Sequence, residues 1–421
     1  MQKYDLAGIG VGPANLSIAA LSEPIPEVKF QFFDSKPEFR WHSGLMLPDS
    51  QLTVTHFRDL VTLVDPTSKF SFLNFLVQKG RAFRFLEANG LSCSRREFEQ
   101  YFQWTAAQLP SIQWGKRVES VSMTADGFRI ALNGGGSSVT RSLVLASGSE
   151  AQVPMFAKPF MGKSVLHSSD LVPLRPEWKG RRVVVIGAGQ SGAEVVNHMV
   201  SDERSLPSSL TWTSSGPNFQ PLDDSPFTDE WFSSNFLRYF NELPAQRRAD
   251  ILREQRNAGV DGITDSLMGS LYRRLYHLDH VIQSDMRHRL LTGRRAVGLT
   301  QEGSHYVVDL HDLNRGKVER VPADLVILCT GYSNQVPEYL KPIQERLAIV
   351  DGEFQTNADY SVDFDGPSDH RVYVQGFAQS SHGISDLVLS LASWRGASII
   401  NSVVGREVYR VTPGATAVDW Q

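Results

Sequence analysis

Two parts of the chain share the same order of apolar and glycine-rich positions. The first has an apolar run at residues 4–9 that ends among glycines, followed by a second apolar stretch at residues 15–21. The second has an apolar run at residues 182–186, another glycine cluster, and an apolar stretch at residues 193–199. Short apolar runs bounded by glycine are typical of buried strands, and the longer stretches suit helices. Each part therefore predicts a strand, a tight turn and a helix.

The first turn reads Gly8-x-Gly10-x-x-Pro13, with Gly12 before the proline. Gly8 permits a tight turn, Gly10 lets a pyrophosphate approach the backbone, and Pro13 suits a first helical turn. The phosphates would lie at the helix N-terminus, where free N–H groups and the helix dipole favour anions. The next apolar strand ends at Asp34, at the spacing where an acid binds the ribose hydroxyls of a dinucleotide.

The second turn is a complete GxGxxG motif. Its residues are Gly187, Ala188, Gly189, Gln190, Ser191 and Gly192. The strand expected at residues 210–212 leads to Ser215 without an acid, which leaves room for a 2′-phosphate and favours NADPH over NADH. The alternative for either motif is a glycine turn without a ligand, and the presence of two copies argues against it.

The order of these motifs predicts an α/β fold with two Rossmann-like dinucleotide-binding domains. Residues 143–148 and 325–331 both look like buried strands that end in small-residue turns, as in flavoproteins with two dinucleotides, so Thr330 and Gly331 are expected at a cofactor. Because the later strand follows the second glycine motif, the first domain should resume after an insertion. The expected segments are an FAD domain at 1–170 and 321–421, an NADPH domain at 175–320, and a helical substrate region at 221–290.

Composition narrows the function classes. The net charge of −4 gives no basic surface for nucleic acid or for a membrane. Cys93 and Cys329 are the only cysteines and lie far apart, so neither a disulfide framework nor a metal site is expected. This cysteine usage fits the cytoplasm. The glycines of the opening stretch argue against a signal peptide, and no apolar run is long enough to predict a spanning helix.

Several segments carry a resemblance to a known family. They include "GIGVGPANLSIAALSE", "RDLVTLVDPTSKFSFLNFL", "SRREFEQYFQW", "DDSPFTDEWF" and "SSHGISDLVLSLASWR". Over nearly its whole length the chain resembles the flavin-dependent amine N-hydroxylases of siderophore biosynthesis, the lysine N6-hydroxylase and ornithine N5-monooxygenase family, and especially the aerobactin-type lysine and diamine hydroxylases. The resemblance implies FAD, NADPH and dioxygen, reaction through a C4a-hydroperoxyflavin, and a homo-oligomer, either dimer or tetramer.

The implied substrate is the terminal primary amine of lysine or of a similar diamine. Cadaverine, putrescine, ornithine and histamine stay open as alternatives, because a methylene alone discriminates by only about 1–3 kcal/mol. A Baeyer–Villiger or sulfur-oxidising monooxygenase would share the fold and the cofactors. A non-catalytic NADP(H) sensor would carry no flavin.

The resemblance also implies four residues at the substrate. Arg58 matches a lysine that holds an amino-acid carboxylate, and its alternative is a surface ion pair with Asp59. Asp229 falls where ornithine hydroxylases have a substrate-binding asparagine, and its alternative is a stabilising acid near a helix start. Asp265 lies near a second such asparagine, and Ser390 matches a serine near the flavin and the substrate.

Five further residues are implied as flavin contacts: Trp41, His42, Gln51, His382 and Leu389. A helix is expected to begin near residue 385 and to direct its N-terminus at the flavin.

One departure concerns Ser215, which stands where relatives have an arginine for the NADPH 2′-phosphate. Arg181, Arg182 and Arg204 are the candidates to replace it.

Overall fold

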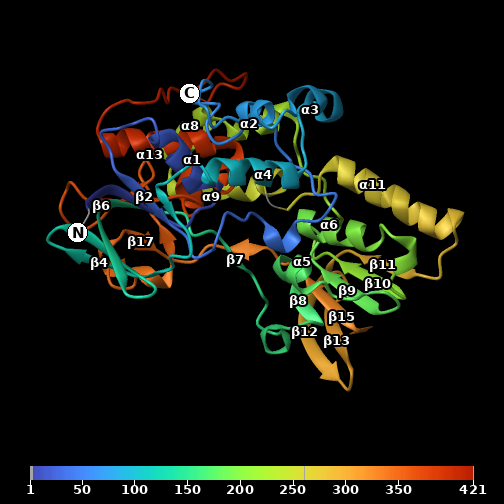
Figure 1. The fold of residues 1–421 in the computed structure, drawn as a ribbon. Coiled ribbons are helices and arrows are strands. Elements are labelled where there is room, and N and C mark those ends of the chain that lie inside the picture. Colours follow the sequence, from blue (N-terminus) through green and yellow to red (C-terminus); the bar gives the residue numbers. More distant parts are fainter. Residues whose placement is uncertain (1–2, 260, 421) are drawn as a thin grey trace.

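The computed structural model describes residues 3–259 and 261–420, which form two α/β units lying next to each other (Figure 1). One unit contains both described ends of the chain, and the other is built from the middle of the sequence. The first unit is organised around an eight-stranded sheet and the second around a five-stranded sheet. This is the α/β architecture with two sheets that the paired glycine motifs predict.

The first sheet has the order β19-β20-β6-β1-β2-β3, with β5 on β6 and β4 on β5. The strands β20, β6, β1, β2 and β3 run parallel, while β4, β5 and β6 form an antiparallel meander. The bounds are β1 Lys3–Ile9, β2 Phe30–Phe33, β3 Ile112–Gln113, β4 Val118–Thr124, β5 Gly127–Leu132, β6 Gly136–Leu145, β19 Ser361–Val362 and β20 Arg371–Val374.

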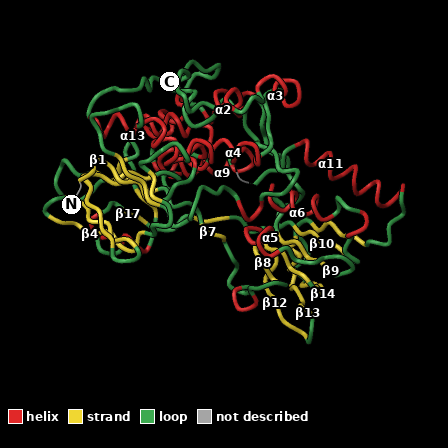
Figure 2. The backbone as a smooth tube through the Cα atoms, viewed as in Figure 1, coloured by secondary structure: helices red, strands yellow, loops and turns green. Residues whose placement is uncertain are grey.

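Helices cover this sheet and bury a large aromatic core. The helix α1 (Pro13–Ser22) follows the first glycine turn and packs against α13 (Ala392–Val404). Nearby lie α2 (Phe72–Gln78), α3 (Ala82–Asn89) and α4 (Arg95–Ala106), and Figure 2 shows this helical layer above the sheet. Fully buried aromatic rings of α2 and α4 pack edge to face or tilted, which fixes the two helices to one another.

The second sheet is entirely parallel, with the order β11-β10-β9-β15-β8. Its bounds are β8 Val165–His167, β9 Arg182–Ile186, β10 Ser209–Thr213, β11 Arg287–Leu291 and β15 Leu325–Leu328. Side chains of β9 alternate between two cores, as strand geometry requires. Val183 and Val185 pack toward the helices, and Val184 and Ile186 pack toward the opposite face.

The layers on this second sheet come from different sequence segments. On one face lie α5 (Leu171–Leu174), α6 (Gln190–Met199) and α11 (Asp265–Tyr276). On the other face lies an antiparallel sheet of β12 (Arg294–Glu302), β13 (His305–Asp312) and β14 (Val318–Ala323). The predicted NADPH boundaries, 175 and 320, therefore differ from the observed sheet, because β8 and β15 both belong to it. Strand membership depends on long-range pairing, which the local pattern does not encode.

Two features connect the units. The strand β7 (Glu150–Ala151) pairs antiparallel with β16 (Tyr332–Ser333), so the chain leaves and re-enters the first unit at adjacent points. The expected helical region also bridges both units. Its helices are α7 (Pro226–Asp229), α8 (Ser234–Glu242), α9 (Ala245–Glu254), α10 (Arg256–Gly259) and α11; α8 and α9 contact α12 (Gln379–His382), and α11 contacts α6.

The helix expected from residue 385 begins later. Two 3₁₀ turns, Ile384–Leu387 and Leu389–Leu391, precede α13, because Val388 between them has an extended backbone. A short hairpin of β17 (Ile349–Val350) and β18 (Glu353–Phe354) completes the first unit. Within the described residues, no helix has both the length and the apolar character needed to cross a membrane.

Candidate functional site

A cavity of about 710 Å³ lies where the two units and the helical region meet. Its lining comes from both glycine turns and from segments far apart in the chain. The lining includes Gly12, Pro13, Trp41, His42, Arg58, Arg95, Gln190, Ser191, Asp223, Asp224, Asp229, Gln375, Asp386, Leu389, Ser390 and Arg395. A volume of this size is within the range of small-molecule and cofactor sites.

The first glycine turn packs so closely against the sheet that side chains at Gly8 and Gly10 would not fit. Gly10 has φ +83°, and a Cβ there would lie 2.5 Å from the Ala146 carbonyl oxygen. A Cβ on Gly8 would lie 2.2 Å from the Phe32 ring. Asp34 Oδ2 accepts a 2.7 Å hydrogen bond from the backbone N–H of Val11 and so braces the turn. The turn and the adjoining helix N-terminus, with Gly12 and Pro13 at the cavity, fit a dinucleotide pyrophosphate.

The second turn has the same construction. Gly187 has φ +115°, and a Cβ there would lie 2.1 Å from the Cys329 carbonyl oxygen. A Cβ on Gly192 would lie 2.2 Å from the Gly187 carbonyl oxygen, so helix α6 packs closely on the turn. Gly189 is the N-cap of α6 without a side-chain cap, and Gln190 and Ser191 line the cavity. This helix N-terminus also fits a dinucleotide phosphate.

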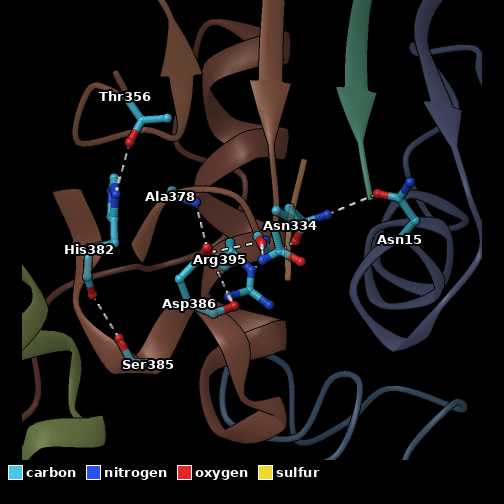
Figure 3. A network of polar contacts seen from close by, with 10 residues as sticks. Asn15, Asn334, Thr356, Ala378, His382, Ser385, Asp386 and Arg395 are labelled. Atoms are coloured by element: carbon cyan, nitrogen blue, oxygen red, sulfur yellow. Dashed lines mark hydrogen bonds and ion pairs between the residues drawn. The ribbon is translucent and has the colours of Figure 1, made fainter. Parts of the chain in front are cut away.

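A buried polar network ties the first turn to the C-terminal helix (Figure 3). Asn15 Nδ2 donates to the Gly10 carbonyl at 2.7 Å, and Asn15 Oδ1 accepts from Gln375 Nε2 at 2.9 Å. Arg395 Nε donates to Gln375 Oε1 at 2.9 Å, and Arg395 Nη1 lies 3.3 Å from Asp386 Oδ1. Asp386 also accepts from the backbone N–H groups at positions 376 and 378. The network fixes one wall of the cavity.

Arg58, Ser390 and Asp229 come together at another part of the cavity. Arg58 Nη1 donates a 3.0 Å hydrogen bond to Ser390 Oγ. Burial raises the pKa of Asp229. The positive charge of Arg58 lowers this pKa in part, and the negative charges of Asp224 and Asp223 raise it further.

The alternative interpretation of Arg58, a surface ion pair with Asp59, is wrong. The Asp59 carboxylate instead accepts hydrogen bonds from the backbone N–H groups of Val61, Thr62 and Phe72. Arg58 is therefore left to the cavity, with its guanidinium on Ser390.

Of the predicted flavin contacts, Trp41, His42 and Leu389 line this cavity. Gln51 lines a second cavity of about 360 Å³. His382 is fully buried and stacks on Tyr360 with ring centroids 4.0 Å apart, and it does not line the cavity.

The remaining predicted residues lie outside the cavity wall. Asp265 is exposed at the first turn of α11, and Ser215 is exposed after β10. Thr330 Oγ1 donates to the Gln152 carbonyl at 2.6 Å, and the Gly331 carbonyl accepts from the Gln152 N–H at 2.9 Å. Both residues therefore lie next to the β7–β16 pairing that connects the units.

Sequence reasoning missed Gln375, Asp386 and Arg395, which form the polar wall. It also missed Arg95, whose side chain lines the cavity from α4 and pairs with Glu194. The hydrogen-bond partners of their side chains lie between 8 and 360 positions away, so no regular spacing marks the three wall residues. A buried arginine after an apolar stretch, as at position 395, is the one signal of an internal partner.

Three comparisons place the chain among known proteins. The family model described as L-lysine 6-monooxygenase/L-ornithine 5-monooxygenase matches residues 2–334. The L-lysine N6-monooxygenase of Escherichia coli is 32% identical over 423 residues, covering 100% of this chain and 99% of the relative. A putrescine N-hydroxylase of Shewanella oneidensis is 31% identical over 417 residues, covering 97% of this chain and 82% of the relative.

The chain is also similar to a solved structure. It is the FAD-bound cadaverine monooxygenase of the desferrioxamine pathway from Erwinia amylovora, with a TM-score of 0.93 and 31% identity, covering 99% of this chain and 98% of that chain.

Proposed function

This chain belongs to the L-lysine 6-monooxygenase/L-ornithine 5-monooxygenase family and is a flavin-dependent N-hydroxylating monooxygenase of siderophore biosynthesis, and we propose that it acts on the terminal primary amine of lysine or a similar diamine. The overall reaction consumes the amine, dioxygen, NADPH and a proton, and yields a hydroxylamine, water and NADP⁺. The observation that carries the proposal is the meeting of Arg58, Ser390 and Asp229 in a cavity that both glycine turns border.

The chain is suited to two dinucleotides. The first turn, with Gly10 and Asn15, would hold FAD, and the second, with Gln190 and Ser191, would hold NADPH. When bound, FAD supplies the redox chemistry and the activation of dioxygen, which no side chain of the cavity provides.

The residues of the cavity must deliver the amine as a nucleophile. A free alkylammonium has a pKa of roughly 10.4 and no lone pair. The reacting end of the substrate therefore needs a site that favours the neutral amine. Desolvation lowers an amine pKa, and the apolar side chains of Trp41 and Leu389, which line the cavity together with the buried Ser390, would desolvate an amine bound against them. Excluding water would also limit the unproductive release of hydrogen peroxide.

The other end of the substrate determines which amine is used. Arg58 can hold a carboxylate through two parallel hydrogen bonds, which favours lysine or ornithine. Asp229 can hold a second ammonium, which lysine and the diamines both carry. Arg58 and Asp229 therefore define the two charged contacts at the non-reacting end.

The test is hydroxylamine formation with FAD and NADPH across lysine, ornithine, cadaverine, putrescine and histamine, with hydrogen peroxide recorded alongside. Hydroxylamine from lysine or a diamine supports the proposal, and product from amino acids alone assigns the carboxylate to Arg58. Peroxide without hydroxylamine from every amine of the set would contradict it.

We also propose that the enzyme works in the cytoplasm as a homo-oligomer, a dimer or a tetramer. Cys93 and Cys329 are both free and buried, as is usual for proteins of a reducing compartment. Size-exclusion chromatography with light scattering tests the oligomeric state, and a monomer at micromolar concentration would contradict it.

A further inference from the structure

The two-stranded ribbon of β7 and β16, which joins the two units, is short. Its paired positions are Tyr332 with Ala151 and Ser333 with Glu150. Isolated two-stranded pairings are marginally stable, so a ribbon this short gives little resistance to bending or twisting. The orientation of the second unit must therefore be fixed by contacts elsewhere.

One such contact is apolar. Leu45 and Leu47 follow the first unit's Trp41–His42 segment, yet both are buried in the core of the second unit. Gly44 makes this close approach possible, since a Cβ there would lie 1.6 Å from the Ser169 carbonyl oxygen.

Beside this contact lies a buried ion pair between the units. Arg95 begins α4 of the first unit, and Glu194 lies in α6 of the second. Their side chains are 13% and 7% exposed, and the pairing is bidentate, with distances of 2.5 Å from Nη2 to Oε1 and 3.0 Å from Nη1 to Oε2. Burying two charges is costly, so such a pair contributes more to a specific geometry than to stability.

Glu194 also contacts the residue that opens α6. Gln190 Nε2 donates to Glu194 Oε1 at 2.9 Å, and Gln190 Oε1 accepts from the Thr264 N–H at 2.9 Å. Ser50 adds a 3.4 Å contact to Glu194 Oε2, and its carbonyl accepts from the Arg95 N–H at 3.0 Å. The Glu194 carboxylate thus joins the first unit, the second glycine turn and the start of α11.

Two of the partners of this carboxylate, Arg95 and Gln190, line the cavity. We propose that Glu194 is a positioning residue: it holds Arg95 and Gln190 in place and locks the second unit in the orientation that turns its dinucleotide-binding helix toward the shared cavity. The inference rests on the proposed function only in taking the second turn as the NADPH site, and it does not depend on which amine is hydroxylated.

The test compares Glu194→Gln with a matched control. Glu194→Gln keeps the shape of the side chain and removes its charge. The control is Asp312→Asn, because Asp312 is also 7% exposed and pairs with Arg294 at 2.9 Å, but does so entirely within the second unit. Both variants are studied as the FAD-loaded full chain, by equilibrium titration with NADP⁺ and by deuterium uptake in residues 43–51 and 95–106.

Glu194→Gln should weaken NADP⁺ binding about tenfold, equivalent to about 1.4 kcal/mol, and should speed deuterium uptake in both segments. In steady state the KM for NADPH should rise while kcat stays near that of the parent. Arg95→Lys keeps a charge but loses the bidentate geometry, so its effect should be smaller and should not add to that of Glu194→Gln in the double variant. Arg95→Lys also replaces Glu194→Gln as the test if the latter does not fold.

Asp312→Asn should match the parent in NADP⁺ binding and in the uptake of both segments. The inference is overturned if Glu194→Gln binds NADP⁺ and exchanges like the parent, or if the control behaves like Glu194→Gln. Failure of the proposed function would show separately, as a parent enzyme that binds NADP⁺ normally and forms no hydroxylamine.

Discussion

The guanidinium of Arg58 donates a 3.0 Å hydrogen bond to the hydroxyl of Ser390, although the two residues are 332 positions apart. The bond fixes one edge of the guanidinium and leaves the other edge available to a ligand. The direction of the Arg58 side chain thus depends on the correct docking of the last helical segment.

Replacing Arg58 tests its role as a carboxylate contact. Arg58→Ala should raise the half-saturating concentration of lysine about 10- to 100-fold, the loss of a charged hydrogen bond of about 1.5–3 kcal/mol. Cadaverine has no carboxylate and should be unaffected. Steady-state hydroxylamine assays with both amines check this, with Arg58→Lys as the charge-conserving comparison. An equal loss for both amines would show that Arg58 shapes the cavity instead.

Asp229 is the candidate contact for the non-reacting ammonium. Asp229→Asn should weaken lysine and cadaverine alike, by about tenfold, because a charged partner becomes neutral. Asp224→Asn is the matched control, since Asp224 also lines the cavity. If both substitutions weaken binding equally, the general negative charge of the wall is responsible and Asp229 has no specific role.

Selectivity for NADPH should improve when an arginine is placed at position 215. Arg182 is paired with Asp324 and Arg204 with Asp202, so either arginine would have to share or release its carboxylate partner to bind a 2′-phosphate. Ser215→Arg should lower the KM for NADPH about tenfold and leave that for NADH unchanged. Ser215→Gln adds a neutral side chain of similar reach and should change neither value. A fall in both KM values would show that the arginine acts on the shared part of the dinucleotide.

The first glycine turn can be tested through the flavin itself. Gly10→Ala places a Cβ 2.5 Å from the Ala146 carbonyl oxygen in a backbone conformation with φ +83°. The purified variant should lose the visible absorbance of bound FAD. Gly162→Ala is the control, because a Cβ there meets nothing within 4 Å. Normal flavin content in Gly10→Ala would place the FAD phosphates elsewhere.

Burial of His382 predicts a pH-dependent stability. Desolvation lowers its pKa to about 4, from an ordinary value of 6.5. Between these values the unfolded chain takes up a proton that the folded chain does not, so acidification lowers the free energy of unfolding by up to about 1.4 kcal/mol per pH unit.

The check is urea unfolding of the FAD-loaded protein from pH 7 to pH 4.5. His382→Phe keeps a ring on Tyr360 and should flatten the pH dependence by about one proton. His280→Phe, which makes the same substitution at an exposed position, is the variant for comparison. An unaltered slope in His382→Phe would mean that other groups carry the proton uptake.

The local parts of the fold were predictable from sequence, and the long-range parts were not. The turns at Gly10 and Gly187 follow from neighbouring residues, since strand, glycine and helix signals lie within a few positions. The membership of β15 in the second sheet depends on its pairing with β9, more than a hundred positions earlier, and the apolar run at 325–328 fits either sheet equally well.

The same distinction explains the site. The resemblance led to Arg58, Asp229 and Ser390, which the fold brings to one cavity. It also led to Asp265 and His382, which the fold places outside the cavity wall, and their roles stay predictions. The polar wall around Arg395 could not be found from sequence, because its hydrogen bonds join positions between 8 and 360 apart with no regular spacing.

The pairing of Tyr332 with Ala151 has an evolutionary consequence. The inserted unit begins and ends at adjacent points, so its removal or exchange would leave the parent sheet uninterrupted. Insertions with neighbouring ends are the ones that proteins tolerate. An exchange of residues 152–331 as one insertion would therefore replace Asp229 and leave Arg58 and Ser390 in place.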